Sequence, residues 1–106
     1  MPEIRPHGDH VTQITTAEVE DGQHQDELLR LMTERARFMA TQPGFISISL
    51  HRSLDGKRVV NYVQWASREK LVAAHQAPEF RAKWPEVGKA AEDIEPALYE
   101  VVHVAA

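Results

Sequence analysis

Four stretches of the chain have the pattern of apolar and polar residues that is typical of β-strands. Residues 11–19 (VTQITTAEV) are rich in β-branched side chains, and residues 45–53 (FISISLHRS) alternate between apolar and polar positions. Residues 58–65 (RVVNYVQW) follow an Asp-Gly pair at 55–56, which is typical of a two-residue type I′ hairpin turn. A last strand is expected over residues 96–104 (PALYEVVHV). The second and third stretches are therefore predicted to form a β-hairpin.

Between these strands, apolar residues recur at three- and four-residue spacing, which predicts amphipathic helices. The first helix is expected over residues 25–42, with an apolar stripe of Leu28, Leu31, Met32, Ala36 and Met39. Pro43 and Gly44 end it, because proline cannot continue the hydrogen-bond ladder and glycine accepts a sharp exit. Ser67 is expected to cap a second helix, with a stripe of Arg68, Leu71, Val72 and His75. Pro78 opens a short helix that carries Phe80, Trp84 and Val87 on one face.

The order strand, helix, strand, strand, helix, strand predicts an α+β fold of the ferredoxin-like βαββαβ type. Its four-stranded antiparallel sheet is expected to carry the helices on one face. Residues 1–10 hold two prolines, a glycine and several charges without periodicity, and we expect a flexible N-terminal arm. The folded domain is therefore expected to span residues 11–106.

The pairing across the hairpin turn decides which side chains share a face of the sheet. With Leu54 opposite Lys57, the register pairs Ile48 with Val63, Leu50 with Asn61 and Ile46 with Trp65. We assign these six inner side chains to the helix side, although a one-residue bulge would change the faces. The opposite face then carries an apolar patch of Val60, Tyr62, Tyr99 and Val101. Such a patch is either an interface with a partner or a solvated antiparallel face.

Composition narrows the chemistry without naming it. The chain has 106 residues, of which 42% are hydrophobic and 26% charged, and its net charge of −4 disfavours nucleic acid as a partner. The absence of cysteine excludes disulfides, thiolate zinc sites and cysteine nucleophiles. No apolar run approaches the roughly 20 residues of a membrane span, and MPEIRPHGDH lacks the apolar stretch of a secretory signal. We therefore expect a cytoplasmic protein with no membrane association.

Asn61 interrupts a run of β-branched residues on the predicted inner face, so its amide needs partners there. It could donate to a ligand oxygen or a developing enolate, or it could satisfy neighbouring backbone. Trp65 lies on the same face and could either form the wall of an aromatic-substrate pocket or fill the core, and Phe80 and Trp84 share this ambiguity. His75 could be a proton shuttle, an axial haem ligand or a partly buried helix residue. Phosphate-binding loops and metal motifs such as HExxH are absent from the sequence.

Three segments together resemble the antibiotic biosynthesis monooxygenase family of small dimeric α+β barrel proteins. They are Pro43-Gly44-Phe45, the turn at 53–56 (SLDG) and the strand at 59–65 (VVNYVQW), and the resemblance covers residues 10–105. It implies a homodimer with one pocket per subunit between sheet and helices. It also implies oxidation of an aromatic or quinol-type, polyketide-like small molecule by O₂ without a cofactor.

The resemblance assigns catalytic roles to two residues of this chain. Asn61 matches an oxyanion donor, and Trp65 matches a π wall and donor through its indole N–H. The side chains expected around the substrate are Leu50, Val63, His75, Phe80 and Trp84. Leu71 stands where the anthrone oxygenases of the family place a tyrosine, which argues against tyrosine-assisted proton transfer here.

Two other functions remain open at this point. Haem-degrading members of the family pair a tryptophan like Trp65 with an axial histidine like His75, but Thr15 stands where they have an asparagine. The protein could also be a non-catalytic dimer that binds small aromatic ligands.

Overall fold

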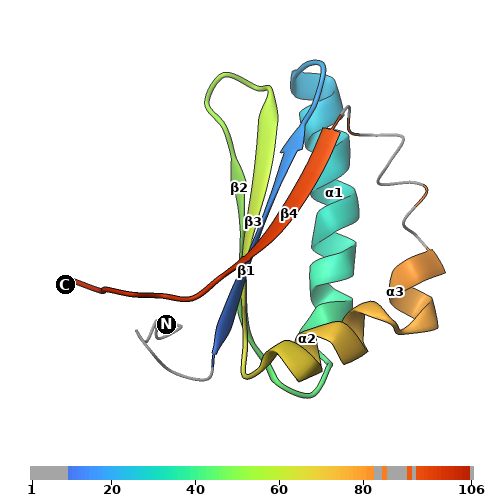
Figure 1. Cartoon of the computed structure of the whole chain (residues 1–106). Coiled ribbons are helices and arrows are strands. Elements are labelled where there is room, and N and C mark those ends of the chain that lie inside the picture. The colour runs from blue at the N-terminus through green and yellow to red at the C-terminus, as the bar shows by residue number, and fades with distance from the viewer. Residues whose placement is uncertain (1–9, 83–84, 86–90, 92, 106) are drawn as a thin grey trace.

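The computed structural model describes residues 10–82, 85, 91 and 93–105, and within them the predicted order of elements is confirmed (Figure 1). The strands are β1 (Val11–Glu18), β2 (Phe45–Arg52), β3 (Arg58–Trp65) and β4 (Asp93–Tyr99), and the helices are α1 (Gly22–Met39), α2 (Arg68–His75) and α3 (Pro78–Ala82). They form the expected ferredoxin-like α+β fold, in which one antiparallel sheet of order β2-β3-β1-β4 carries the helices on one face. In this part of the chain no helix has the length and apolar character of a membrane span.

Some predicted features fall outside the described residues. Among them are residues 1–9 of the expected N-terminal arm, together with Trp84 and Val87 of the expected short helix. The described part of that helix is α3, which buries Phe80.

The hairpin of β2 and β3 has the predicted register over most of its length. Ile48 pairs with Val63 and Leu50 pairs with Asn61, so the prediction is confirmed there. The prediction for Ile46 was wrong: the register shifts between residues 45 and 47, and Phe45 takes the place opposite Trp65. An extra residue of this kind is a β-bulge, and it brings Phe45 edge-on to the indole of Trp65 at 5.6 Å between ring centroids.

The turn of this hairpin is longer than the two-residue loop that the sequence predicts. The backbone hydrogen bond nearest the turn runs from Ser53 N to Arg58 O (3.0 Å). Within the turn, Gly56 N donates to Ser53 O (3.2 Å). Asp55 Oδ1 accepts from Ser53 Oγ (2.6 Å) and from Lys57 N (3.0 Å), which stabilises the wider loop. Gly56 has a φ of +78°, so a residue with a side chain would be strained there.

Helix α1 begins three residues earlier than predicted, because Asp21 caps it. The Asp21 side chain accepts a hydrogen bond from His24 N at 3.0 Å and thereby satisfies a free donor of the first turn. The helix ends at Met39, three residues before the predicted end. Gly44 in the following connection has a φ of +83°, and a Cβ built there would lie 2.5 Å from Lys70 Cβ. Glycine is therefore required both by the backbone conformation and by the close approach to α2.

Helix α2 has the predicted cap but a different buried face. Ser67 Oγ accepts from Lys70 N at 3.2 Å, as expected. Leu71 and Ala74 are buried, whereas Val72 is 42% exposed, so the prediction that Val72 points inward was wrong. The predicted stripe also placed Arg68 inward, and it is exposed. The buried face of α2 is centred on Leu71, so the next residue, Val72, points outward.

Strand β4 differs from the predicted strand over residues 96–104 at both ends. It begins at Asp93 and ends at Tyr99, which pairs with Thr12 near the start of β1. Beyond that pair β1 offers almost no further backbone partners, so the chain leaves the sheet as an extended tail (Figure 1). Val101 therefore lies outside the sheet and not on its face, which corrects the prediction.

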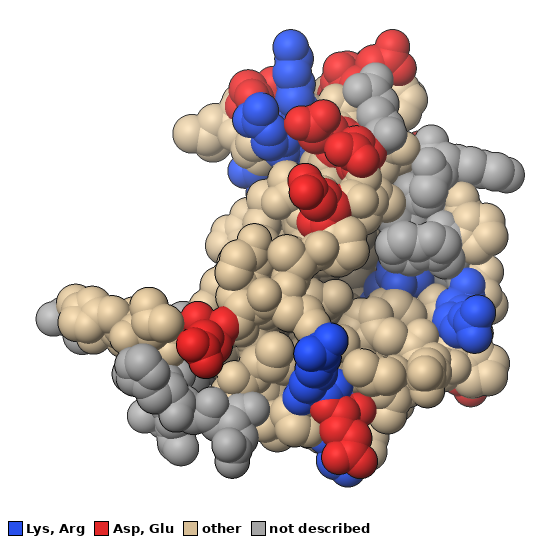
Figure 2. All heavy atoms as spheres, viewed as in Figure 1, with Lys and Arg blue, Asp and Glu red and all other residues tan. Residues whose placement is uncertain are grey.

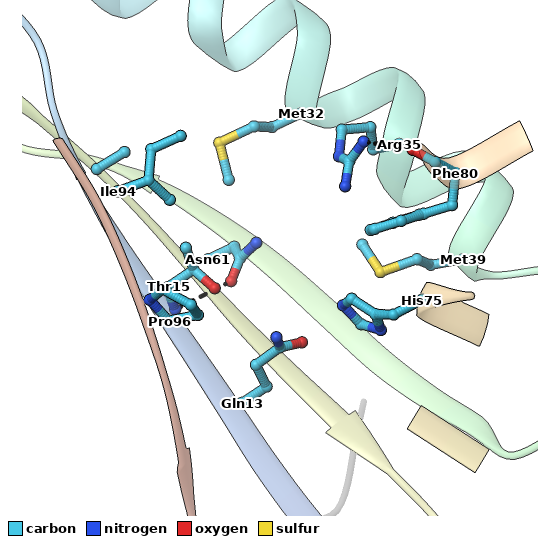
Figure 3. Close-up of a pocket in the computed structure, with 11 residues that line it drawn as sticks. Gln13, Thr15, Met32, Arg35, Met39, Asn61, His75, Phe80, Ile94 and Pro96 are labelled. Carbon is cyan, nitrogen blue, oxygen red and sulfur yellow. Dashed lines mark hydrogen bonds between the residues drawn. The ribbon is translucent and has the colours of Figure 1, made fainter. Parts of the chain in front are cut away.

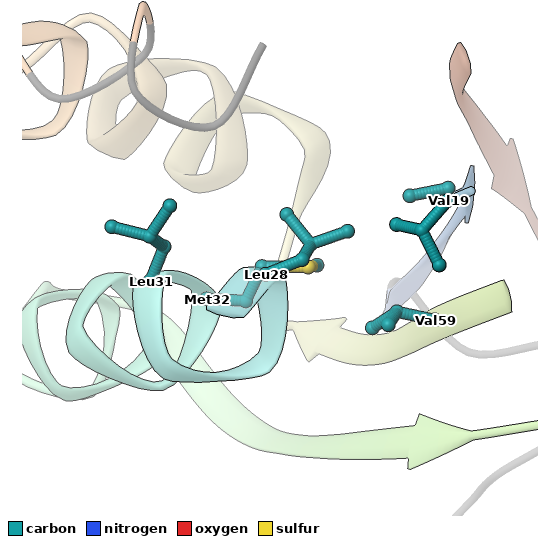
Figure 4. Packing of buried hydrophobic residues seen from close by; sticks show 6 residues of the cluster. Val19, Leu28, Leu31, Met32 and Val59 are labelled. Atoms are coloured by element: carbon teal, nitrogen blue, oxygen red, sulfur yellow. The ribbon is translucent and has the colours of Figure 1, made fainter. Parts of the chain in front are cut away.

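Two buried apolar clusters hold the helices on the sheet. The first, shown in part in Figure 4, consists of Ala17, Val19, Leu28, Leu31, Met32 and Val59. The second consists of Met39, Val63, Trp65, Leu71, Ala74 and Phe80. Burial of these side chains is the main favourable term in holding the layers together. Both clusters contribute walls to a cavity between the sheet and α1.

Candidate active site

A cavity of about 110 Å³ lies between the sheet and the helices. Figure 3 shows the residues around it, which are Gln13, Thr15, Ala17, Met32, Arg35, Met39, Asn61, His75, Phe80, Ile94 and Pro96. They come from β1, α1, β3, α2, α3 and β4, because the strand register places every second residue of the central strands on the helix side. The walls are thus mostly apolar, with a few polar groups that converge on one space, as in small-molecule sites.

The amide of Asn61 has one end bonded to the sheet and the other directed to the cavity. Its Oδ1 accepts from the backbone N–H of Thr15, the residue opposite on β1, at 3.2 Å. A backbone N–H can only donate, so the oxygen must be the atom that faces it, and Nδ2 is left on the cavity side (Figure 3). Among the described residues no acceptor bonds to this Nδ2. The sequence left two alternatives for Asn61: the structure shows the bond to neighbouring backbone and leaves Nδ2 on the cavity side.

His75 is a neutral imidazole whose proton position is defined by the structure. Its Nδ1 lies 2.8 Å from Leu71 O, and because a carbonyl only accepts, Nδ1 carries the hydrogen. The other nitrogen, Nε2, therefore keeps its lone pair. Burial lowers the pKa of His75 below its usual 6.5, and the nearby charge of Arg35 lowers it further, while the bond to Leu71 O acts in the opposite direction. The ring can thus accept a proton at neutral pH.

Arg35 brings a positive charge to the cavity from the apolar stripe of α1. Its Nη1 donates to Phe80 O at 2.8 Å, and its guanidinium carbon lies 3.6 Å from the centre of the Phe80 ring. Burial lowers the pKa of Arg35 to about 10, so the group stays protonated at neutral pH. Phe80 in turn packs against His75, with ring centroids 4.6 Å apart. Arg35, Phe80 and His75 therefore form one connected wall.

A larger hollow of about 430 Å³ opens outward from the same wall. It is lined by Arg35, His75, Phe80, Arg81 and Pro85. The inner cavity alone is smaller than the roughly 150 Å³ that holds a benzene molecule. A fused aromatic ligand would therefore need both spaces, with Arg35, His75 and Phe80 at their junction.

The structure brings together three of the residues singled out in the sequence, Asn61, His75 and Phe80. Trp65 does not line the cavity: it is fully buried behind His75 at 6.2 Å between ring centroids, and its Nε1 has no partner among the described residues. Val63 lies in the second apolar cluster and Leu50 packs against the first, and neither is among the residues that line the cavity.

Sequence reasoning missed two polar residues of the site. Arg35 was detectable as a charge within the stripe of Leu31, Met32 and Met39, where an amphipathic helix normally has apolar residues. Gln13 is 9% exposed and occupies the inward face of β1, two positions before Thr15, so strand alternation could have indicated it. The described residues contain no cluster of side chains suited to hold a metal ion.

Comparison with known proteins gives a consistent picture. The family model described as antibiotic biosynthesis monooxygenase matches residues 10–83. Tetracenomycin-F1 monooxygenase of Streptomyces glaucescens is 39% identical over 56 residues, which are 53% of this chain and 47% of that protein. The match thus spans about half the length of that curated relative.

Two crystal structures illustrate the likeness in fold. SnoaB of Streptomyces nogalater, described as a cofactor-independent oxygenase, superposes with a TM-score of 0.81 at 24% identity, over 92% of this chain and 97% of its own. The ActVA-Orf6 monooxygenase of Streptomyces coelicolor, in complex with nanaomycin D, gives 0.77 at 24% identity, over 91% and 90%.

Proposed function

The chain belongs to the antibiotic biosynthesis monooxygenase family, and from that premise we propose that it is a monooxygenase without a cofactor. Its substrate is an aromatic or quinol-type, polyketide-like small molecule, which it oxidises with O₂. The observation that carries the proposal is the convergence of a free amide donor, Asn61 Nδ2, and an unprotonated imidazole, His75, on one largely apolar cavity. Two of the similar proteins are described as a tetracenomycin-F1 monooxygenase and as a cofactor-independent oxygenase, and these descriptions support the reaction type.

The first step is removal of a proton from the substrate. Nε2 of His75 accepts the proton from a phenol, or from the carbon acid of an anthrone-like ring, and becomes an imidazolium. The negative charge develops on the ring oxygen, where Asn61 Nδ2 can donate a hydrogen bond. A preorganised donor in a space that excludes water stabilises such an oxyanion much more than a donor in water does.

The second step is reduction of O₂ by the substrate anion, so that the substrate supplies the electrons. One electron passes to O₂, and the resulting substrate radical and superoxide combine to form a C–O bond. The peroxide takes back the proton from His75 and becomes a hydroperoxide. Loss of water, with cleavage of the O–O bond and of the remaining C–H bond, leaves a quinone carbonyl. One O₂ is thus consumed for each carbonyl and each water formed.

For Trp65 we propose a positioning role that acts through His75. The indole is fully buried, packs edge-on against His75 and is itself held by Phe45. It supports the orientation in which His75 Nδ1 bonds to Leu71 O. Trp65→Phe is therefore expected to lower turnover and to change its pH dependence.

We also propose that the protein acts as a homodimer in the cytoplasm. The sheet face opposite the helices carries the half-buried side chains of Ile14, Val60 and Tyr62, and Tyr99 on β4 is 50% exposed. A second copy would remove this apolar surface from water. Light scattering should give twice the chain mass, and Tyr62→Glu should shift the protein to monomer. A monomeric wild-type protein at micromolar concentration would contradict the dimer.

Oxygen uptake with a hydroxyanthrone, or with a phenol that carries hydrogen at its para carbon, tests the activity. The wild-type protein should consume one O₂ per quinone formed, without release of hydrogen peroxide. Asn61→Asp keeps an oxygen for Thr15 N but removes the donor, so turnover should fall at least about 100-fold. Arg37→Gln, an exposed change on α1, is the matched control and should leave turnover unchanged.

Other outcomes would point to the alternatives. No uptake with any such compound, together with a hemin Soret band that His75→Ala abolishes, would favour haem binding through the same Nε2. No uptake, together with a melting temperature raised by aromatic ligands, would favour a non-catalytic binder.

A further inference from the structure

Gln13 differs from the other buried glutamines of the described chain, because its amide has no partner there. Among the described residues the buried glutamines are Gln13, Gln25 and Gln64. Gln25 Nε2 donates to two backbone carbonyls, at 2.9 and 3.1 Å, and Gln64 Nε2 donates to Thr12 Oγ1 at 3.1 Å. The amide of Gln13 makes no such bond within this part of the chain, although the residue is only 9% exposed. A buried amide without partners has lost its hydrogen bonds to water, so its place in the sheet calls for an explanation.

The strand register explains why Gln13 has no partner. On β1 it lies between Val63 of β3 and Leu98 of β4, and neither of these side chains can form a hydrogen bond. The next inward residue of β1, Thr15, has Asn61 as its neighbour on β3. Gln13 is therefore a polar side chain in an otherwise apolar row of the inner face.

The amide of Gln13 faces the cavity. Gln13 is one of the lining residues, and in Figure 3 its amide extends from β1 into the space that Asn61 and His75 also border. Gln64 Oε1 is enclosed by the protein without a partner, whereas the polar atoms of Gln13 are not enclosed in this way. A ligand in the cavity therefore meets a donor, Nε2, and an acceptor, Oε1, that the described protein leaves unused.

A hydroxyl is a ligand group that matches such an amide, because it can both donate to Oε1 and accept from Nε2. It also carries no charge, and in the face seen in Figure 2 the middle of the molecule is mostly uncharged, with charged side chains mainly toward its ends. A ligand group that takes the place of water at a polar side chain lowers the affinity unless it reproduces the hydrogen bonds of that water. A hydroxyl reproduces them, whereas a methyl group does not.

We propose that Gln13 is a specificity residue that binds a hydroxyl group of the substrate other than the reacting oxygen. The inference rests on the proposed function and names the substrate class more closely: an aromatic compound with two neighbouring oxygens on one edge. Gln13 and Asn61 are diagonal neighbours on adjacent strands, so their side chains start about 7 Å apart and can reach the same edge of a ring system. Asn61 Nδ2 donates to the reacting oxygen, and Gln13 binds the hydroxyl beside it.

Two naphthols that differ in one group test this proposal without turnover. 1,8-Dihydroxynaphthalene and 8-methyl-1-naphthol have nearly the same size, and only the first has the second hydroxyl. Calorimetric titration in oxygen-free buffer should show that the wild-type protein binds the diol about tenfold more tightly. Gln13→Leu should abolish that preference and bind 8-methyl-1-naphthol at least as tightly as the wild type does. Gln64→Leu, the same substitution on the opposite face of the sheet, should keep the preference in full.

Equal affinity of the wild-type protein for the two naphthols would overturn the proposal, as would a preference that survives in folded Gln13→Leu. If Gln13→Leu does not fold, Gln13→Met, which is unbranched and close to glutamine in length, decides by the same criterion. Failure of the oxygenase function is distinct, because O₂ uptake would be absent while the wild-type preference for the diol remained. Conversely, O₂ uptake by a wild-type protein without this preference would overturn the role of Gln13 alone.

Discussion

Asn61 and Gln64 are two buried amides on the same strand, β3, and they face opposite sides of the sheet. Each side chain forms a hydrogen bond to β1: Asn61 Oδ1 accepts from Thr15 N, whereas Gln64 Nε2 donates to Thr12 Oγ1 at 3.1 Å. Asn61 is left with a donor that faces a cavity, and Gln64 with an acceptor, Oε1, that is buried and has no partner among the described residues. Burial of a polar side chain therefore does not by itself identify a site. The polar end that remains must also face a space that a ligand can enter.

Truncation of each amide to alanine should show the largest difference in turnover between the two positions. Asn61→Ala removes the donor from the cavity, so kcat/KM should fall by about 10²- to 10³-fold. Gln64→Ala leaves the cavity unchanged, and its turnover, measured on folded protein, should stay within about threefold of wild type. Equal losses in the two variants would show that Asn61 acts through the stability of the sheet and not on the substrate.

Turnover should also depend on pH, because His75 lines the cavity on the Asn61 side of the sheet. The pKa of His75 is lowered below 6.5, so the neutral base predominates above pH 6.5. Turnover should be flat there and fall about tenfold per pH unit once the pH drops below the folded-state pKa. Between pH 6.5 and this lower folded-state pKa the unfolded chain binds the proton more readily, so the contribution of His75 to stability is lost as the pH falls through that range.

His75→Gln is the control for that profile. Its turnover should be low and no longer show the acidic limb, and circular dichroism should show less loss of stability between pH 6.5 and 5 than in the wild type. An unchanged acidic limb in this variant would assign the titration to another group.

The smallest effect is expected on the Gln64 side. Gln64→Leu removes the unpartnered Oε1 together with the bond to Thr12, and an apolar group of similar size suits a buried position. The free energy of unfolding should therefore change by no more than about 1 kcal/mol, as measured by urea denaturation. A loss of several kcal/mol would mean that Oε1 is bonded in solution, for example to a second copy of the chain at this face.

Local pattern was sufficient for most of the fold. Alternation at 45–53 and at 58–65 predicted β2 and β3 and the pairs Ile48–Val63 and Leu50–Asn61, because a period of two residues allows few registers that bury one face. The same pattern placed Asn61 on the inner face. It did not predict the bulge between residues 45 and 47, which depends on how Phe45 packs on Trp65.

The end of β4 shows a different kind of limit. The apolar residues beyond Tyr99 have strand-like composition, but a strand needs a neighbouring strand to pair with. β1 offers almost no backbone partner beyond its pair between Thr12 and Tyr99. Composition reports what a segment could form, whereas pairing depends on the length of another strand.

The amino-acid pattern was enough to predict the α+β order of elements, the inner position of Asn61, and the presence of His75 and Phe80 on neighbouring helices. Those features follow from short-range periodicity, which the chain carries locally. Three features depend on contacts in the folded chain: Asn61 presents Nδ2 to the cavity, Trp65 lies behind His75, and Arg35 forms part of the cavity wall. Each of these depends on which atom of a distant residue occupies the adjoining space. Packing between elements far apart in the chain determines which atom lies there, and the periodicity of a single element does not predict it.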